Sequence, residues 1–592
     1  MYQQKYIFTI NDQFAEQSAI HVKASDLYSP ERDYGFITEE NMAQQPDLML
    51  PELNGSFMPV PWYSLLEPAP IRATAYGCQI NKTDADRQIP LRFKCNVPSD
   101  GSYRVRFLLR SEEELSDIRI FTGRRSLAAY LEKLPAAEAY SGEAYTEVCG
   151  IIPRGQEQIY GNRCIELSVT ANRPCLSEVT IESIQCPVLY IAGDSTVTDQ
   201  SAQYPYAPQE SYAGWGQLLP YYIEGMLTVS NHSHSGLTTE SFRQEGHAAI
   251  PMGRFQKGDY MFFQFGHNDQ KLAHLTAKEG YSSNLRAYIE ECRSAGVYPL
   301  LVTPVARNTW RGSDGAYNDL LEEYAAACLL LGEQMSVPVL DLHRLSMEFV
   351  IRMEKEGAKK YFYPSDYTHH NDFGAQQMAA FICQEIKRVC GNWQIDSSGT
   401  AEMNAYQKLA AAIRENPLLW KEPVSLSPLQ PPVGFHVQEA TEEFAEPDRP
   451  SDTLLRAEAL DMVIRRAGFF ITNVYNDYFT DIIGHEWYAG AVECGLQNGI
   501  VTKDMCQDRK FYPTDPITRL DFITFLMMAY KSRRTLPCET HTPYHGTVKE
   551  TLLPLLSAAC QLGILAPDGS DALDGQISRH TGAALCRKLK IM

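Results

Sequence analysis

Within the first 186 residues, several segments are strand-like, and in some of them apolar and polar positions alternate, which is typical of strands with one buried face. The alternation is clearest at 91–97 and 103–109, where Leu, Phe, Cys, Val and Tyr occupy every second position. A Ser-Asp-Gly-Ser turn lies between these segments, so we expect a β-hairpin. Further strands are expected at 5–10, 19–23, 118–121, 164–170 and 179–184. Residues 1–186 are therefore predicted to form a β-sandwich domain.

The pattern changes over residues 187–395, where short apolar runs alternate with longer helical patterns. Helices are expected between the strands, for example at 283–295 and 317–334. Strands that alternate with helices form a parallel sheet covered on both faces, so this segment is predicted to be an α/β/α domain. Its strands are expected at 188–192, 227–231, 259–265, 297–303 and 337–342.

The end of the chain contains a helix, a linker and an internal repeat. A helical pattern at 401–415 and a proline-rich stretch predict that residues 396–450 are a helix and a linker. Beyond it, the segments 455–458, 517–521 and 577–579 each open an apolar helical pattern, and their arginines, Arg456, Arg519 and Arg579, are 63 and 60 residues apart. Such a period predicts a helical repeat domain over 451–592.

Composition and charge narrow the choice of partners and compartment. The net charge of −20 at pH 7 argues against nucleic acid and against anionic membrane surfaces as partners. No apolar run approaches the roughly 20 residues of a membrane span, and no signal peptide is visible at the start of the sequence. The fifteen cysteines are scattered without a CxxC pair, as in proteins whose thiols stay reduced. These features favour a cytoplasmic protein.

Four clusters of polar residues lie after strands of the predicted parallel sheet. Ser195 follows the first strand, the segments 231–236 and 266–269 follow the second and third, and 366–369 lies beyond the fifth. The carboxyl ends of parallel strands share one edge, where open α/β sheets bind their ligands. We therefore expect the four clusters to meet in one site.

The four clusters contain the groups that acyl transfer requires. A serine becomes a nucleophile when a histidine removes its proton, and a carboxylate orients that histidine. Asp366 and His369 are three residues apart, so one local turn can bring carboxylate and imidazole together. The backbone N–H groups of Ser195 and Gly236 and the side-chain amide of Asn268 are candidates for binding the oxyanion.

Four segments occur in the order of the sequence blocks of the SGNH (GDSL-type) hydrolases: AGDSTV, NHSHSGLTTESF, FGHND and DYTHHNDFGA. They most resemble the rhamnogalacturonan acetylesterase branch. The resemblance implies a flavodoxin-like domain, no metal or other cofactor, and removal of acetyl groups from plant cell-wall polysaccharide. Carried over by motif, Ser195 is the nucleophile, His369 the base and Asp366 its orienting carboxylate. Ser195, Gly236 and Asn268 then form the oxyanion hole.

Several neighbouring residues have an ordinary structural explanation beside a functional one. His370 is a second candidate for the base, although the DxxH spacing favours His369. His267 either lines the substrate pocket or makes a structural hydrogen bond. Arg307 and Trp310 either contact the sugar or belong to the core. His370, His267, Arg307 and Trp310 are therefore kept as candidate substrate-binding residues.

The flanking regions resemble other modules. Residues 1–186 resemble the galactose-binding-like domains of bacterial polysaccharide-acting esterases. The segments 479–501 and 511–519 resemble S-layer homology repeats, whose arginines bind anionic cell-wall polymer. The sequence has diverged around the first and third arginine, in LLRAE and ISRHT. We therefore expect a helical domain that packs on the esterase or on a second subunit of a homo-oligomer. A cell-surface protein that binds wall polymer is the alternative to the cytoplasmic location.

Together, these patterns predict a multidomain serine esterase that deacetylates poly- or oligosaccharides. Acetylated rhamnogalacturonan (pectin) fragments are the first choice of substrate, and acetylated xylan or oligosaccharides are the second. A wall-binding protein with an idle hydrolase domain is the alternative from another class. The complete set of Ser195, Asp366 and His369 argues against it.

Overall fold

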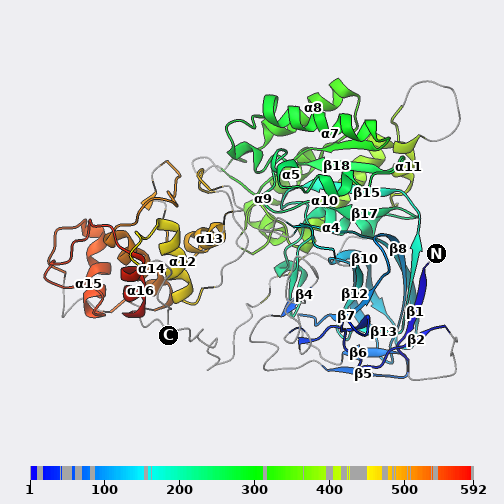
Figure 1. Cartoon of the computed structure of the whole chain (residues 1–592), viewed down its shortest axis with the longest axis horizontal. Coiled ribbons are helices and arrows are strands. Elements are labelled where there is room, and N and C mark those ends of the chain that lie inside the picture. The colour runs from blue at the N-terminus through cyan, green and yellow to red at the C-terminus, as the bar shows by residue number, and fades with distance from the viewer. Residues whose placement is uncertain are drawn as a thin grey trace. The chain divides into compact units, whose positions relative to one another are not determined.

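The chain folds into two compact units, residues 1–433 and 434–592, each with its own hydrophobic core. Most of the predicted proline-rich linker lies outside the described residues. Among those that are described, no helix has both the length and the apolarity to cross a membrane. The computed structural model (Figure 1) describes residues 2–9, 18–39, 42, 57–59, 70–80, 87–152, 158–161, 163–310, 316–364, 366–394, 404–414, 423–424, 426, 450–469, 478–482, 486, 488–502, 505–506, 508–534, 536–537 and 544–588.

The N-terminal part of the first unit consists of β-sheets that face one another. Their side chains share one core, in which the ring of Phe93 lies 5.0 Å from that of Tyr6 and 4.9 Å from that of Phe8. The β-rich character predicted for this region is confirmed. One layer contains β2 (Ile20–His21), β1 (Gln3–Ile7), β14 (Glu178–Ile184), β8 (Gly101–Arg110) and β11 (Ala139–Val148). The facing layer contains β10 (Ser126–Leu134), β9 (Leu115–Thr122), β12 (Cys164–Thr170), β7 (Leu91–Asn96) and β3 (Tyr34–Phe36).

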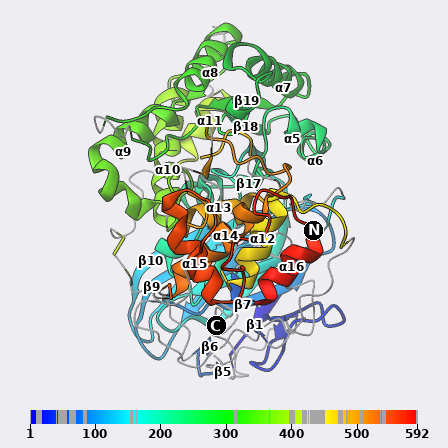
Figure 2. The ribbon, with the colours of Figure 1, turned by 90° about the vertical axis from the view of Figure 1, so that its left-hand side faces the viewer.

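Short strands complete this part. They form two small sheets, β13 (Cys175–Leu176) with β6 (Cys78–Ile80) and β5 (Ile71–Ala73), and β16 (Ala202–Tyr204) with β4 (Phe57–Pro59). Within the first unit, β5 and β6 lie at the end opposite to α7 (Ser282–Ser294) and α8 (Glu322–Met335) (Figure 1, Figure 2).

The predicted hairpin of 91–97 and 103–109 is wrong, although both strands exist. β7 pairs with β12 and β3 in one sheet, whereas β8 pairs with β11 and β14 in the other. The intervening turn therefore carries the chain from one sheet to the facing one. Alternating hydrophobicity shows that a strand has one buried face, but it does not show whether the next strand lies beside that strand or opposite to it.

The second part of this unit is the predicted α/β/α domain. Five parallel strands have the order β17–β15–β18–β19–β20, as in flavodoxin-like sheets. Leu189 and Ile191 point into the core beneath α10 (Asp372–Glu385), whereas Tyr190 and Ala192 point into the core beneath α7 and α8. Helices therefore cover both faces. The strands are β15 (Val188–Gly193), β17 (Thr228–Asn231), β18 (Tyr260–Gln264), β19 (Tyr298–Val302) and β20 (Val339–Leu340).

Other helices of this domain include α4 (Trp215–Leu218), α9 (Leu342–Ala358) and α10 (Asp372–Glu385). The predicted helix at 401–415 is present as α11 (Ala405–Ala411), with 401–403 and 415 outside the described residues.

The β-rich part and the α/β part share one sheet. β11 lies parallel to β17 through the pair Thr146 and Val229, so ten strands follow in the order β2–β1–β14–β8–β11–β17–β15–β18–β19–β20. Residue 186, the boundary expected from the sequence, falls between β14 and β15 of this sheet. The two parts therefore meet along a hydrogen-bonded edge as well as through their cores.

The second unit contains three similar helices that begin at the three repeat arginines. They are α12 (Arg456–Arg466), α14 (Arg519–Arg533) and α16 (Arg579–Lys588), with α13 (Ala489–Gln497) and α15 (Leu553–Gln561) between them. The segments before these helices are hydrogen-bonded in a ring. Leu454 donates to Ile577 (2.9 Å), Ile577 to Ile517 (3.4 Å) and Ile517 to Leu454 (3.0 Å). Three copies of the repeat thus close on themselves with approximate threefold symmetry.

The arginines continue this pattern. Arg456 forms an ion pair with Asp521 of the second copy (3.2 Å), and Arg579 forms one with Glu458 of the first. Arg519 pairs instead with Asp571, which precedes the third copy, because Thr581 occupies the position of the acidic residue in that copy. The divergence noted in the third copy therefore replaces one ion pair of the ring by another.

Candidate active site

The site lies at the carboxyl edge of β15, with β17 on one side and β18 on the other. Strand order reverses at β15, which makes this edge the crevice where open α/β sheets bind ligands. Ser195 follows β15, Gly236 lies in the loop after β17, and Asn268 lies in the loop after β18. Asp366 and His369 come from the segment before α10.

Ser195, His369 and Asp366 form a hydrogen-bonded chain. Ser195 Oγ lies 2.8 Å from His369 Nε2, and His369 Nδ1 lies 2.8 Å from Asp366 Oδ2. The other carboxylate oxygen, Oδ1, accepts the backbone N–H groups of Thr368 (2.7 Å) and His369 (2.9 Å). The DxxH segment therefore folds back on its own carboxylate, which fixes the imidazole. This geometry suits a serine nucleophile, a base and an orienting group.

Tyr212 supports this chain and has no counterpart in the sequence predictions. Its hydroxyl donates a hydrogen bond to the carbonyl of Ser195 (2.8 Å), and its ring meets the ring of His369 edge-on at 5.2 Å. Burial raises the pKa of Tyr212 well above its ordinary value, so the phenol remains a donor. A tyrosine in the loop before α4 belongs to no motif, and its role follows only from its contacts.

The two remaining oxyanion candidates, Gly236 and Asn268, lie in loops that touch each other. Gly236 has φ +88°, in the left-handed region that favours glycine. Asn268 donates from Nδ2 to the carbonyl of Leu237 (3.0 Å) and accepts from Lys271 Nζ (2.9 Å). An amide group has two N–H donors, so the contact with Leu237 uses one of them.

His267 makes the structural hydrogen bond that was one of its two predicted roles. Its Nδ1 lies 3.2 Å from Asp194 Oδ2, and Asp194 Oδ1 accepts the backbone N–H (3.0 Å) and hydroxyl (2.8 Å) of Thr196. Burial favours the neutral form of Asp194, but His267 and Thr196 outweigh it and hold the pKa of the carboxyl below its ordinary value. This buried pair ties the loop after β18 to the turn that carries Ser195.

Asp269 joins the loops after β17 and β18. Its carboxylate accepts the N–H (2.9 Å) and hydroxyl (2.6 Å) of Thr239 and the N–H of Gly266 (3.2 Å). Burial raises the pKa of Asp269 to about 7. The loops that carry Gly236 and Asn268 are thus fixed to each other by a buried carboxyl.

The other candidate residues lie around this centre. His370 is buried against Phe362, with ring centroids 4.6 Å apart, and burial lowers its pKa to about 3, so its imidazole stays neutral. Arg307 is also buried and donates to the carbonyl of His267 (3.3 Å). Trp310 is half-buried, and its Nε1 donates to Asn308 (2.7 Å). Their contact with substrate remains a prediction.

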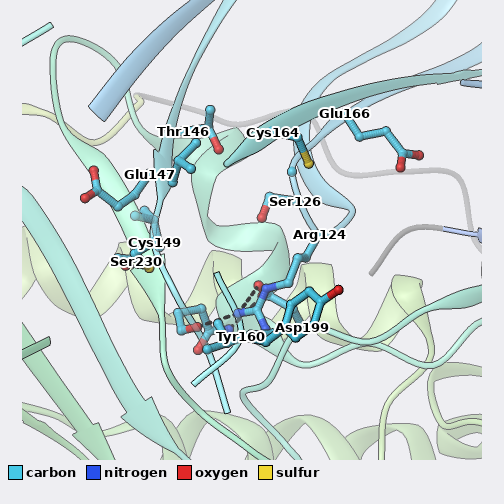
Figure 3. Close-up of a pocket in the computed structure, with 15 residues that line it drawn as sticks. Arg124, Ser126, Thr146, Glu147, Cys149, Tyr160, Cys164, Glu166, Asp199 and Ser230 are labelled. Carbon is cyan, nitrogen blue, oxygen red and sulfur yellow. Dashed lines mark hydrogen bonds and ion pairs between the residues drawn. The ribbon is translucent and has the colours of Figure 1, made fainter. Parts of the chain in front are cut away.

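A cavity of about 90 Å³ lies at the seam of the β-rich and α/β parts (Figure 3). Arg124 lines it, pairs with Asp199 (3.0 Å) and donates to the carbonyl of Asn231 (2.7 Å). Burial raises the pKa of the Cys149 thiol in its wall, so this cysteine is no ready nucleophile. Within the described part of the chain, no group of three or more His, Cys, Asp or Glu side chains could hold a metal ion.

Comparisons with known proteins give matches in both units of the chain. Residues 191–377 match the sequence model of the GDSL-like lipase/acylhydrolase family, and residues 478–523 match that of the S-layer homology domain. The chain is 32% identical to the rhamnogalacturonan acetylesterase RhgT of Bacillus subtilis (strain 168) over 216 residues, which are 34% of this chain and 90% of RhgT.

Two further relatives come from the same bacterium. The uncharacterized esterase YxiM is 26% identical over 388 residues, 65% of this chain and 91% of YxiM. The probable rhamnogalacturonan acetylesterase YesY is 30% identical over 209 residues, 34% of this chain and 93% of YesY. The match to YxiM is longer than the α/β part alone.

Proposed function

Because the chain belongs to the GDSL-like lipase/acylhydrolase family and is an esterase, we propose that it removes O-acetyl groups from rhamnogalacturonan poly- or oligosaccharides. The observation that carries this proposal is the hydrogen-bonded chain of Ser195, His369 and Asp366. The substrate class is supported by RhgT, whose name states that activity.

In the proposed reaction, His369 Nε2 takes the proton of Ser195 as Oγ attacks the acetyl carbonyl carbon. Asp366 stabilises the imidazolium, and the N–H groups of Ser195, Gly236 and Asn268 bind the oxyanion. The tetrahedral intermediate collapses as His369 gives its proton to the sugar oxygen, which leaves as a hydroxyl. Water then attacks the acetyl-serine while His369 takes its proton, and His369 returns that proton to Ser195 Oγ as the ester bond breaks and acetate is released.

The test is acetate release from acetylated rhamnogalacturonan fragments, with acetylated xylo-oligosaccharides as the competing substrate class. We expect the higher kcat/KM for the rhamnogalacturonan fragments and loss of turnover in Ser195→Ala. A higher kcat/KM for the xylan-derived substrate would refute the proposed substrate class but not the proposed esterase chemistry. Turnover retained in Ser195→Ala would refute the proposed nucleophile.

The cytoplasmic location predicted from the sequence is not supported, because residues 478–523 match the S-layer homology domain. We therefore propose the alternative, in which the second unit binds cell-wall polymer at the cell surface. A sedimentation assay with purified cell wall tests it. Binding of the intact protein that is weakened by Arg519→Ala supports the proposal, and absence of binding contradicts it. Association of the chain with a second copy stays a prediction, which a measurement of the molar mass in solution by light scattering would test.

A further inference from the structure

Two consecutive arginines, Arg124 and Arg125, lie in the turn that joins β9 to β10 in the β-rich part, and both reach the α/β part. Arg124 lines the cavity at the seam (Figure 3). Its side chain is 24% exposed. Arg125 has φ +59°, in the left-handed region that non-glycine residues rarely adopt. Its side chain is fully buried. Of the two arginines in the turn, Arg125 thus has both the unusual backbone conformation and the more deeply buried guanidinium.

All three nitrogens of the Arg125 guanidinium donate to segments of the α/β part. Nη1 donates to Asp372 Oδ2 (2.5 Å), Nη2 to the carbonyl of Tyr212 (2.6 Å), and Nε to the carbonyl of Gln200 (3.1 Å). Nη2 also lies 3.3 Å from Gln217 Oε1. Only a planar guanidinium can reach such a set of acceptors at once, so lysine cannot reproduce this arrangement.

Two of these acceptors belong to groups that touch the candidate catalytic residues. Tyr212 donates through its hydroxyl to the carbonyl of Ser195 (2.8 Å), and its ring packs against His369. Asp372 begins α10 three residues after His369, and its carboxylate also accepts the hydroxyl of Tyr206 (2.7 Å). Arg125 therefore lies one contact away from both members of the pair that must exchange a proton.

The segments on either side of Arg125 are also joined to each other. The backbone N–H of Ala213 donates to the carbonyl of His370 (3.2 Å). Tyr212 and Asn371 form a β-bridge. The guanidinium thus closes a small network in which the Tyr212 segment and the start of α10 lie side by side. Without it, the buried carboxylate of Asp372 and the carbonyl of Tyr212 would both lose a charged donor.

From these contacts we propose that Arg125 is a positioning residue of the esterase, supplied to the active site by the β-rich part. It fixes Tyr212 and the start of α10, and through them it keeps Ser195 Oγ within hydrogen-bond distance of His369 Nε2. The inference rests on the proposed roles of these two residues. It makes the β-rich part a component of the active site and not only a neighbouring domain.

A second buried ion pair serves as a control that distinguishes a positioning role of Arg125 from a purely structural one. Arg92 pairs with Glu166 (2.7 Å) and donates to the carbonyl of Phe57 (2.8 Å), all within the β-rich part. Its guanidinium is as enclosed as that of Arg125, at 3% against 0% exposed. Arg92→Met therefore removes a comparable buried ion pair without touching the Tyr212 segment or α10.

The experiment measures hydrolysis of 4-nitrophenyl acetate by the full chain, at a temperature where circular dichroism shows each variant folded. Arg125→Met should lower kcat by about 10²-fold, the usual effect of misplacing reacting groups by about 1 Å. KM should change by less than about threefold, because Arg125 touches no substrate. The kcat of Arg125→Lys, whose side chain can still pair with Asp372, should lie between those of Arg125→Met and wild type. The control Arg92→Met should keep the wild-type kcat.

A double-mutant cycle with Tyr212→Phe tests the route of the effect. If Arg125 acts through Tyr212, the double variant loses much less than the product of the two single losses in kcat. Wild-type kcat in Arg125→Met, an equal loss in Arg92→Met, or independent effects in the cycle would each overturn the inference. If Arg125→Met does not fold, the cycle is run with Arg125→Lys. Wild-type turnover that does not depend on Ser195 would instead refute the proposed function.

Discussion

Asp366→Asn is the substitution whose effect follows most directly from the hydrogen bonds of the site. Asp366 Oδ1 accepts two backbone N–H groups, and Oδ2 faces His369 Nδ1. In the variant, the amide oxygen should keep facing the two N–H groups. Turning the amide would leave the donors of Thr368 and His369 unmet in a buried site, at about 1–3 kcal/mol each.

In the favoured orientation, the NH₂ group of the new asparagine faces His369 Nδ1. The imidazole must then accept at Nδ1 and carry its proton on Nε2, where it can no longer accept the proton of Ser195. In Ser-His-Asp triads this change of tautomer lowers kcat by about 10⁴, or about 5.4 kcal/mol. The fold should remain intact, because the substituted side chain has the same shape.

The assay is kcat/KM for 4-nitrophenyl acetate at pH 7, with thermal unfolding as the check on folding. Asp319→Asn is the matched control, because Asp319 also pairs with a histidine, His343 Nε2, at 2.8 Å, in a pair outside the candidate triad. The control should retain activity within about threefold. A folded Asp366→Asn variant within about tenfold of wild type would refute the orienting role of Asp366.

Three further predictions concern the base, the oxyanion hole and the pH dependence of stability. His369→Ala should abolish turnover while His370→Ala retains it, and the reverse pattern would make His370 the base. Asn268→Ala should lower kcat by about 10²–10³ with little change in KM; a change confined to KM would make Asn268 a substrate-binding residue. Burial alone would lower the pKa of His343, but its partner Asp319 outweighs burial and raises that pKa above 6.5. The pair of His343 and Asp319 therefore stabilises the fold fully below pH 6.5, and this stabilisation is lost as pH rises through the folded pKa. The difference in unfolding free energy between wild type and Asp319→Asn, measured in urea, should therefore shrink above pH 6.5; a constant difference would contradict this assignment.

The parallel sheet and the chain of Ser195, His369 and Asp366 could be predicted because their signals are local. Each strand of the sheet is a short apolar run, polar clusters follow the first three of them, and parallel order brings those clusters to one edge. The DxxH spacing needs only one turn of chain. Features that depend on residues close together in the sequence, such as these strands and the DxxH turn, could therefore be predicted.

Features that depend on long-range contacts could not be predicted in this way. The two strands at 91–97 and 103–109 were recognised, but their partners lie elsewhere in the chain, so the hairpin was wrong. Arg125 and Asp372 are separated by 247 residues, and neither belongs to a motif. Tyr212 likewise gains its place only when its loop packs beside His369. Such residues are found from burial and hydrogen bonds.

The cytoplasmic location predicted from the sequence lacks support for a different reason. The net charge and scattered cysteines describe average composition, whereas a surface module is recognised by a short repeat. The repeat was visible in the sequence, with its arginines at the starts of α12, α14 and α16. Such a repeat carries more information about location than average composition does.

The central claim is that Ser195 carries the acetyl group during deacetylation of rhamnogalacturonan. The most direct test is mass spectrometry of the protein after rapid acid quench during turnover of acetylated rhamnogalacturonan fragments. The account predicts one added acetyl group on the peptide that contains Ser195, and no such adduct in Ser195→Ala. Turnover with the acetyl group on another residue, or turnover that persists in Ser195→Ala, would contradict it.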